Sequence, residues 1–235
     1  MAFSSFDLIV PDIEKPYLNY STKSVKDSNI AMLKRIKSQY GFIISKWAKV
    51  FKIDSGIIIA FIATESGGVQ SIRNASYPDI KGLMQISPSG VFDTITKWSV
   101  ESSEPLPSQA VAYIKLKIPE LLQKGVKYTS QVKSKIVLLT GNDAEFNIMS
   151  GTALLRWLIE RYSSPIFGGQ LNKAMIAYNA GAYTKSLGGV KADVSPIDSA
   201  ILAKNVKVPL ESRNYLLKMF GEDGFLSLIY KDKVI

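Results

Sequence analysis

The pattern of apolar and polar positions predicts a chain built mainly of α-helices. Apolar residues recur at helical spacing up to residue 51, and Asp27 or Ser28 is placed to cap the start of that helix. Similar spacing predicts helices over residues 88–98, 142–162, 170–180 and 209–220, with a turn at 164–169 and another helix opening at Ser195-Pro196. Residues 108–124 have helical spacing with a break at Pro119, whereas residues 125–141 are compatible with helix or strand.

One predicted helix differs from the others because it is apolar on every side. Residues 57–63 form a continuous apolar run, with Asp54 as its candidate N-cap and Gly67 and Gly68 at its end. Such a run is typical of a helix buried in the core, and glycine adopts the left-handed conformation that helix C-termini favour. Glu65 lies at the end of this helix. Burial and the helix dipole oppose ionisation there, so we expect a raised pKa and a possible general acid; a solvated glutamate is the plainer alternative.

Composition narrows the chemistry that the chain can perform. Its 235 residues are 46% hydrophobic, which is enough to bury a substantial core in one or two domains. The chain contains neither histidine nor cysteine. Ser-His and Cys-His catalysis, disulfide bonds and the usual histidine-containing zinc sites are therefore excluded. An enzyme of this composition has to act through carboxylates, hydroxyls, amides and lysines.

The formal net charge of +9 favours an anionic partner. The lysines are scattered rather than gathered into a stripe or tail, so we do not expect nucleic acid to be that partner. Peptidoglycan, with its anionic stem peptides, fits the charge as well, and a solvated basic surface without a specific partner is the plainer alternative. No stretch approaches the ~18 uncharged apolar residues of a membrane span, and the first residues lack the pattern of a signal peptide.

Five short sequence blocks follow one another in a defined order. They are Glu65-Ser66, Ser76 ahead of Gly82-Leu83-Met84-Gln85-Ile86, Asn147-Ile148-x-x-Gly151, Ala177-Tyr178-Asn179-Ala180-Gly181, and Glu211-Ser212-x-x-Tyr215. In this order they resemble the lytic transglycosylases of the soluble-lytic-transglycosylase type, a branch of the lysozyme-like superfamily. The resemblance spans roughly residues 40–220. It implies a mainly α, lysozyme-like transglycosylase domain over residues 27–235, with an N-terminal arm at 1–26 and an insertion at 99–141.

The resemblance also implies an activity and a catalytic residue. In this family one glutamate, here Glu65, protonates the glycosidic oxygen of peptidoglycan and then deprotonates the C6 hydroxyl of N-acetylmuramic acid, which closes on C1. Ordinary glycosidases use two carboxylates, but one suffices when the substrate supplies the nucleophile. Asp79 is the nearest second acid in this stretch, at a place where the family pattern usually has glycine. No metal and no organic cofactor is implied.

Supporting roles follow from the blocks that surround the catalytic helix. By resemblance, Ser76 hydrogen-bonds the catalytic carboxyl, while Met84 and Gln85 line the floor of the cleft near the cleaved bond. The plainer alternatives are a loop serine and a methionine that fills the core.

The two C-terminal blocks contribute the remaining candidates. By resemblance, Tyr178 places its hydroxyl beside the catalytic glutamate, and Asn179 holds a loop or an N-acetyl group. Glu211 and Tyr215 are four positions apart and therefore share a helix face, where the tyrosine could stack on a sugar ring. A core aromatic is the plainer alternative for Tyr178.

The sequence departs from the family pattern at three places. Leu154 stands where the family often has tyrosine, Ser212 replaces threonine, and residues 69–80 lack the usual Phe-Asn-Pro opening. None of these departures removes a proposed catalytic group, but subsite preferences in the loop cannot be carried over.

Three classes of function remain open at this point. The first is a lytic transglycosylase that opens peptidoglycan locally, as part of a phage virion or a secretion machine whose proteins would contact residues 1–26 or 99–141. The second is a hydrolytic muramidase similar to goose-type lysozymes, with Glu211 as the candidate second carboxylate. The third is a structural module that keeps the fold without activity. The first class implies a location in a phage particle or at the bacterial cell envelope.

Overall fold

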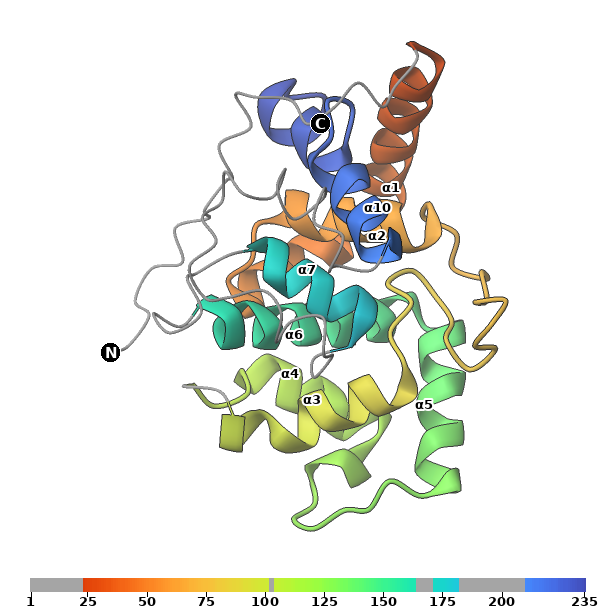
Figure 1. The fold of residues 1–235 in the computed structure, drawn as a ribbon. Coiled ribbons are helices and arrows are strands. Elements are labelled where there is room, and N and C mark those ends of the chain that lie inside the picture. The colour runs from red at the N-terminus through yellow and green to blue at the C-terminus, as the bar shows by residue number, and fades with distance from the viewer. Residues whose placement is uncertain (1–22, 102–103, 164–170, 182–209) are drawn as a thin grey trace. The chain divides into compact units, whose positions relative to one another are not determined.

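The computed structural model describes residues 23–101, 104–163, 171–181 and 210–235 (Figure 1). Over these residues the chain is mainly α-helical and contains no β-strand, as the hydrophobic pattern predicts. The chain divides into two compact units. The first contains Tyr40–Trp157, and the second contains the described residues of 5–39 and of Leu158–Ile235. The predicted turn at 164–169, the helix at Ser195-Pro196 and most of the predicted N-terminal arm lie outside the described residues.

Helices make up 72% of the described chain. They are α1 (Lys23–Phe51), α2 (Ser55–Ser66), α3 (Pro88–Glu101), α4 (Ser108–Lys117), the 3₁₀ turn η1 (Pro119–Leu122), α5 (Ser130–Asn142), α6 (Ala144–Ser163), α7 (Leu171–Ala180), α10 (Leu210–Phe220) and the π-helix η4 (Ser227–Lys231). The break predicted at Pro119 is confirmed, because α4 ends just before it. The ambiguous stretch 125–141 forms a loop followed by α5.

The start of α1 was predicted wrongly. The helix begins at Lys23, so the candidate caps Asp27 and Ser28 lie inside it. Long-range contacts explain the extra turn: Lys26 Nζ lies 2.7 Å from the Asp232 carboxylate, and Asn29 Nδ2 donates to the backbone oxygen of Asp223 at 2.9 Å. Both partners belong to the C-terminal segment of the same unit. Capping residues in the local sequence give no information about contacts with residues so far away along the chain.

The signals at both ends of α2 are confirmed. The Asp54 side chain accepts a hydrogen bond from the backbone N–H of Gly56 at 2.7 Å. Gly67 has φ 60° and donates its N–H to the oxygen of Ala63 at 3.1 Å, which closes the last turn. Every residue from 57 to 63 is at most 5% exposed. The helix is therefore buried on all sides, and its position is fixed by the core of the first unit.

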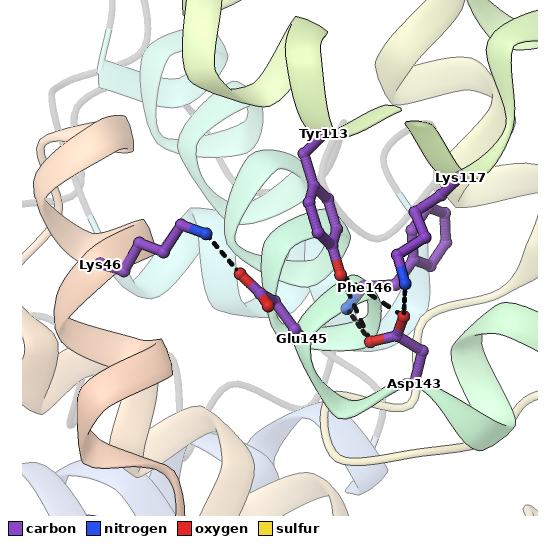
Figure 2. A network of polar contacts seen from close by, with 6 residues as sticks. All are labelled: Lys46, Tyr113, Lys117, Asp143, Glu145 and Phe146. Carbon is purple, nitrogen blue, oxygen red and sulfur yellow. Dashed lines mark hydrogen bonds and ion pairs between the residues drawn. The ribbon is translucent and has the colours of Figure 1, made fainter. Parts of the chain in front are cut away.

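The segment expected to be an insertion, 99–141, is packed into the first unit. The ring of Tyr113 on α4 meets the ring of Trp47 edge-on, with 5.3 Å between their centroids. The hydroxyl of Tyr113 and the ammonium of Lys117 both reach Asp143, at the start of α6 (Figure 2). The segment thus contributes to the core and to the polar network of its own unit.

Asp143 confirms the predicted cap of α6. One of its carboxylate oxygens accepts from the N–H of Phe146 at 2.9 Å, and the other lies 2.7 Å from Lys117 Nζ (Figure 2). Burial works against the charged carboxylate, but the Lys117 ammonium and the Phe146 N–H outweigh it and hold the pKa of Asp143 below its usual range. Burial and the charge of Asp143 raise the pKa of the Tyr113 hydroxyl, which therefore stays protonated and donates.

The C-terminal segments contribute much of the buried core of the second unit. Helix α10 packs against α7, and Leu216, Met219 and Phe220 of α10 are almost fully buried. The apolar residues 225, 226, 228 and 229 are also buried, as predicted for the segment that follows α10. These contacts position the two C-terminal sequence blocks.

Candidate functional site

Glu65 lies in the last turn of α2 and is half-buried. The hydroxyl of the next residue, Ser66, donates to the oxygen of Ile62 at 3.1 Å and accepts from the N–H of Gly68 at 3.1 Å. Ser66 therefore ties the helix end to the turn that follows it. The glutamate therefore lies at the boundary between a buried helix and a loop.

The loop after α2 is organised by side-chain and backbone hydrogen bonds. The side-chain oxygen of Asn74 accepts from the N–H groups of Ser76 and Tyr77, both at 3.0 Å. Ser76 is exposed in this loop, and its predicted hydrogen bond to Glu65 stays a prediction. Asp79 forms an ion pair with Lys133 of α5 at 2.6 Å, which ties the loop to that helix.

The segment after this loop adopts a backbone conformation that few residues tolerate. Gly82 has φ 89°, and Gln85 has φ 44° although it carries a side chain. A non-glycine residue in the left-handed region costs on the order of 1 kcal/mol, and such residues concentrate at functional sites. The Gln85 side chain compensates in part, because its Nε2 donates to the oxygen of Gly82 at 2.8 Å.

Asn147 of α6 makes three side-chain hydrogen bonds, two to this segment and one to α5. Its Oδ1 accepts from the N–H of Met84 at 2.8 Å, and its Nδ2 donates to the oxygens of Lys81 and Thr140, both at 3.0 Å. Asn147 is fully buried. Only an amide side chain offers one acceptor and two donors in this arrangement. The third sequence block therefore holds the second block in place.

Two glycines make this close packing possible. A Cβ atom on Gly82 would lie 2.3 Å from Asn147 Nδ2, and a Cβ on Gly151 would lie 2.5 Å from Met84 Sδ. Met84 is fully buried against Gly151, as the core-filling alternative expects. Gly82 of the second block thus makes room for Asn147 of the third, and Gly151 of the third block makes room for Met84 of the second.

The fourth and fifth blocks meet in the second unit. The hydroxyl of Ser212 on α10 donates to the side-chain oxygen of Asn179 on α7 at 3.0 Å. Ser212 is almost fully buried, so the threonine-to-serine departure keeps the hydroxyl that this contact uses. Gly181 follows with φ 97° and ends α7 by donating its N–H to the oxygen of Ala177 at 2.9 Å.

The other candidates of the second unit differ in exposure. Glu211 is exposed, Tyr178 is half-buried and Tyr215 is 6% exposed. Although Glu211 and Tyr215 are one turn apart on α10, only the glutamate faces solvent freely. The ring of Tyr215 is mostly enclosed by protein.

The structure thus groups the candidates in two sets. The first unit holds Glu65, Ser76, Met84 and Gln85; the second holds Tyr178, Asn179, Glu211 and Tyr215. The positioning role of Asn147 was not predicted from the sequence. The sequence feature that could have indicated this role is the amide side chain of Asn147 between the apolar residues Phe146 and Ile148. Gln70, whose Nε2 donates to the backbone oxygen of Gly141 at 3.0 Å, was also missed, and nothing in its sequence context distinguishes it.

No protein-family model matches this sequence, and no characterised protein is significantly similar to it. None of the helices in the described ranges is long and apolar enough to cross a membrane.

Proposed function

We propose that this protein is a peptidoglycan lytic transglycosylase with a lysozyme-like domain. It cleaves the β-1,4 bond between N-acetylmuramic acid and N-acetylglucosamine and leaves a 1,6-anhydro end on the muramic acid. Glu65 is the catalytic residue, and its position just after the buried run 57–63 of α2 supports this role. The +9 net charge favours approach to the anionic cell wall.

The observation that carries the proposal is the pairing of the sequence blocks. Asn147 satisfies the backbone of the Gly82–Ile86 block, and Ser212 of the fifth block binds Asn179 of the fourth. Chance matches between short motifs would not be expected to meet in space through complementary hydrogen bonds. Within each unit, the sequence blocks are therefore joined to one another by side-chain hydrogen bonds, as expected of motifs that form a single site.

The proposed reaction needs one carboxyl group and no water. The Glu65 carboxyl gives its proton to the glycosidic oxygen as the bond from that oxygen to C1 breaks. The resulting carboxylate then takes the proton of the C6 hydroxyl, whose oxygen forms the new bond to C1. The substrate's N-acetyl group stabilises the positive charge that develops at C1. One bond is exchanged for another, and Glu65 returns to its protonated state.

We place this activity at the bacterial cell envelope, as a component of a phage virion or a secretion machine that opens the wall locally. The mainly α architecture is compatible with this proposal. A hydrolytic muramidase would cleave the same bond, and the products distinguish the two.

The proposal is tested by digesting purified peptidoglycan with the wild type and with Glu65→Gln. The substitution keeps size and hydrogen-bonding capacity but removes the acid, so cleavage should fall by about 100- to 10,000-fold. Glu222→Gln makes the same change at an exposed glutamate and should leave the rate unchanged. Matching unfolding curves would show that both variants are folded. Wild-type rates in the Glu65 variant would overturn the assignment.

A further inference from the structure

A pocket of about 300 Å³ lies in the first unit, between the loop after α2 and the C-terminal end of α5. These two segments run side by side in Figure 1. The loop contributes Gln70, Arg73 and Lys81, and the helix contributes Val137, Leu138 and Gly141. The volume is at the lower end of the range for ligand sites, which suits a small ligand or a few residues of a longer one.

The walls of this pocket are held in place by hydrogen bonds. The Gln70 Nε2 donates to the oxygens of Thr140 and Gly141, at 3.3 and 3.0 Å. Arg73 and Lys81 face each other in an isolated antiparallel bridge, flanked by the bond from the N–H of Asn74 to the oxygen of Ile80 at 3.1 Å. The pocket is therefore formed before any ligand arrives, which lowers the entropic cost of binding.

The absence of a side chain at Gly141 shapes the pocket. A Cβ atom there would lie 3.1 Å from Cδ of Lys81. The glycine thus leaves room for the lysine stem to lie against α5.

The charge of the pocket is positive. Among the described residues, no carboxylate forms an ion pair with Arg73 or Lys81. The acidic residue of the same loop, Asp79, is paired with Lys133. The carbonyl oxygens at the end of α5 would oppose an anion, but Gln70 donates to two of them. A carboxylate held between a guanidinium and an ammonium is a strong, charge-assisted arrangement.

The α5 side of the pocket rim is apolar. Val137 and Leu138 line the pocket there, and Leu138 is 61% exposed. Exposed aliphatic side chains beside two cations fit a ligand that combines a carboxylate with small apolar groups. An inorganic anion would make no apolar contact with this rim.

We propose that this pocket binds a short peptide that ends in a free carboxylate, namely the stem peptide of peptidoglycan. Arg73 and Lys81 hold the carboxylate, and Val137 and Leu138 contact the methyl groups of its alanine residues. This inference rests on the proposed function and extends it, because the enzyme would then recognise the stem peptide as well as the glycan strand. The pocket would direct cleavage to strands that carry stem peptides.

The test measures binding of a synthetic stem tetrapeptide without sugar to the full chain, by titration calorimetry or NMR. Replacing the terminal carboxylate by a carboxamide should weaken binding about tenfold or more. The double variant Arg73→Gln/Lys81→Gln should weaken the carboxylate peptide by a similar factor. Lys124→Gln/Lys127→Gln removes the same charge from exposed positions and should leave binding unchanged.

Three results would overturn the proposal. They are equal binding of the carboxamide, equal loss in both double variants, and displacement of the peptide by inorganic phosphate at equal concentration. Should the Arg73 and Lys81 variant fail to fold, Leu138→Glu gives a second test, because that side chain is already exposed. It places a negative charge on the rim and should weaken the peptide about tenfold; unchanged binding would again overturn the proposal.

Activity assays separate this proposal from the proposed function. The Arg73→Gln/Lys81→Gln variant should be slower on intact peptidoglycan and unchanged on glycan strands stripped of their peptides. Peptide binding without any cleavage by the wild type would overturn the proposed function and leave the pocket standing. Cleavage of both substrates at wild-type rates by the variant would overturn the pocket alone.

Discussion

The side-chain oxygen of Asn147 accepts the backbone N–H of Met84 at 2.8 Å, across 63 positions of sequence. The same amide donates to the oxygens of Lys81 and Thr140. One side chain therefore joins α6, the end of α5 and the turn that contains Gln85 in its left-handed conformation. This junction fixes the geometry of the segment that the resemblance places near the cleaved bond.

Asn147→Ala is expected to destabilise the fold strongly. The change removes the hydrogen bonds to the N–H of Met84 and the oxygen of Lys81, and leaves the oxygen of Thr140 only its weaker bond from Gln70. The loss should lower the free energy of unfolding by about 2 to 4 kcal/mol. Urea unfolding measures the loss. Asn214→Ala, at an exposed position of α10, is the matched control and should change stability by less than about 0.5 kcal/mol. If both variants unfold at the same urea concentration, Asn147 does not hold the junction.

Gly151→Ala should be destabilising although alanine favours helices. The new methyl group would lie 2.5 Å from Met84 Sδ and 2.7 Å from its Cβ, so we expect a loss of about 1 to 3 kcal/mol. Gly141→Ala meets only the flexible Lys81 stem and should be close to neutral. In a Met84→Gly background, which removes both the Sδ and the Cβ atom, the Gly151 substitution should cost much less, and a double-mutant cycle measures that coupling. Additive losses would contradict the close contact.

The stabilisation by Asp143 should depend on pH. Its pKa is lower in the folded protein than in the unfolded chain, so the unfolded state takes up a proton first as the pH falls. The stability difference between the wild type and Asp143→Asn should therefore be complete above about pH 4 and disappear as the pH falls through the folded pKa. Asp79→Asn, in an exposed pair with Lys133, should show a smaller difference. Unfolding measured from pH 7 to pH 3 gives both curves, and a constant difference for Asp143 would contradict the expected shift.

Ser212→Ala tests the junction of the second unit. Removing the hydroxyl leaves Asn179 Oδ1 without this donor, and the free energy of unfolding should fall by about 1 kcal/mol. Ser134→Ala, at an exposed position of α5, is the control and should be neutral or slightly stabilising. Thermal unfolding of the two variants compares them directly, and equal midpoints would argue against a role for Ser212.

Local signals predicted the helices well because caps act within a few residues. Asp54, Gly67 and Asp143 end or begin helices where the sequence indicates. The start of α1 was wrong because Lys26 and Asn29 are held by residues about two hundred positions away. Residues 125–141 could not be assigned because their pattern suits helix and strand equally.

The contacts within the candidate site could be predicted only in part. The resemblance selected the blocks, but the amide of Asn147 and the methionine it positions are far apart in the sequence. The pocket beside Arg73 and Lys81 arises from a backbone bridge that has no sequence signature. Pairing across long separations depends on the packing of whole helices, which a pattern along the chain does not contain.

Cleavage by Glu65 with formation of an anhydro end is tested by the mass spectrum of the muropeptides that the wild type releases from purified peptidoglycan. We predict products that end in 1,6-anhydro-N-acetylmuramic acid, lighter by one water than hydrolysed products, and their loss in Glu65→Gln. Reducing-end products would contradict it and point to a muramidase, with Glu211 as the next carboxylate to replace. Release of no muropeptides by the wild type would contradict any catalytic role and leave a structural one.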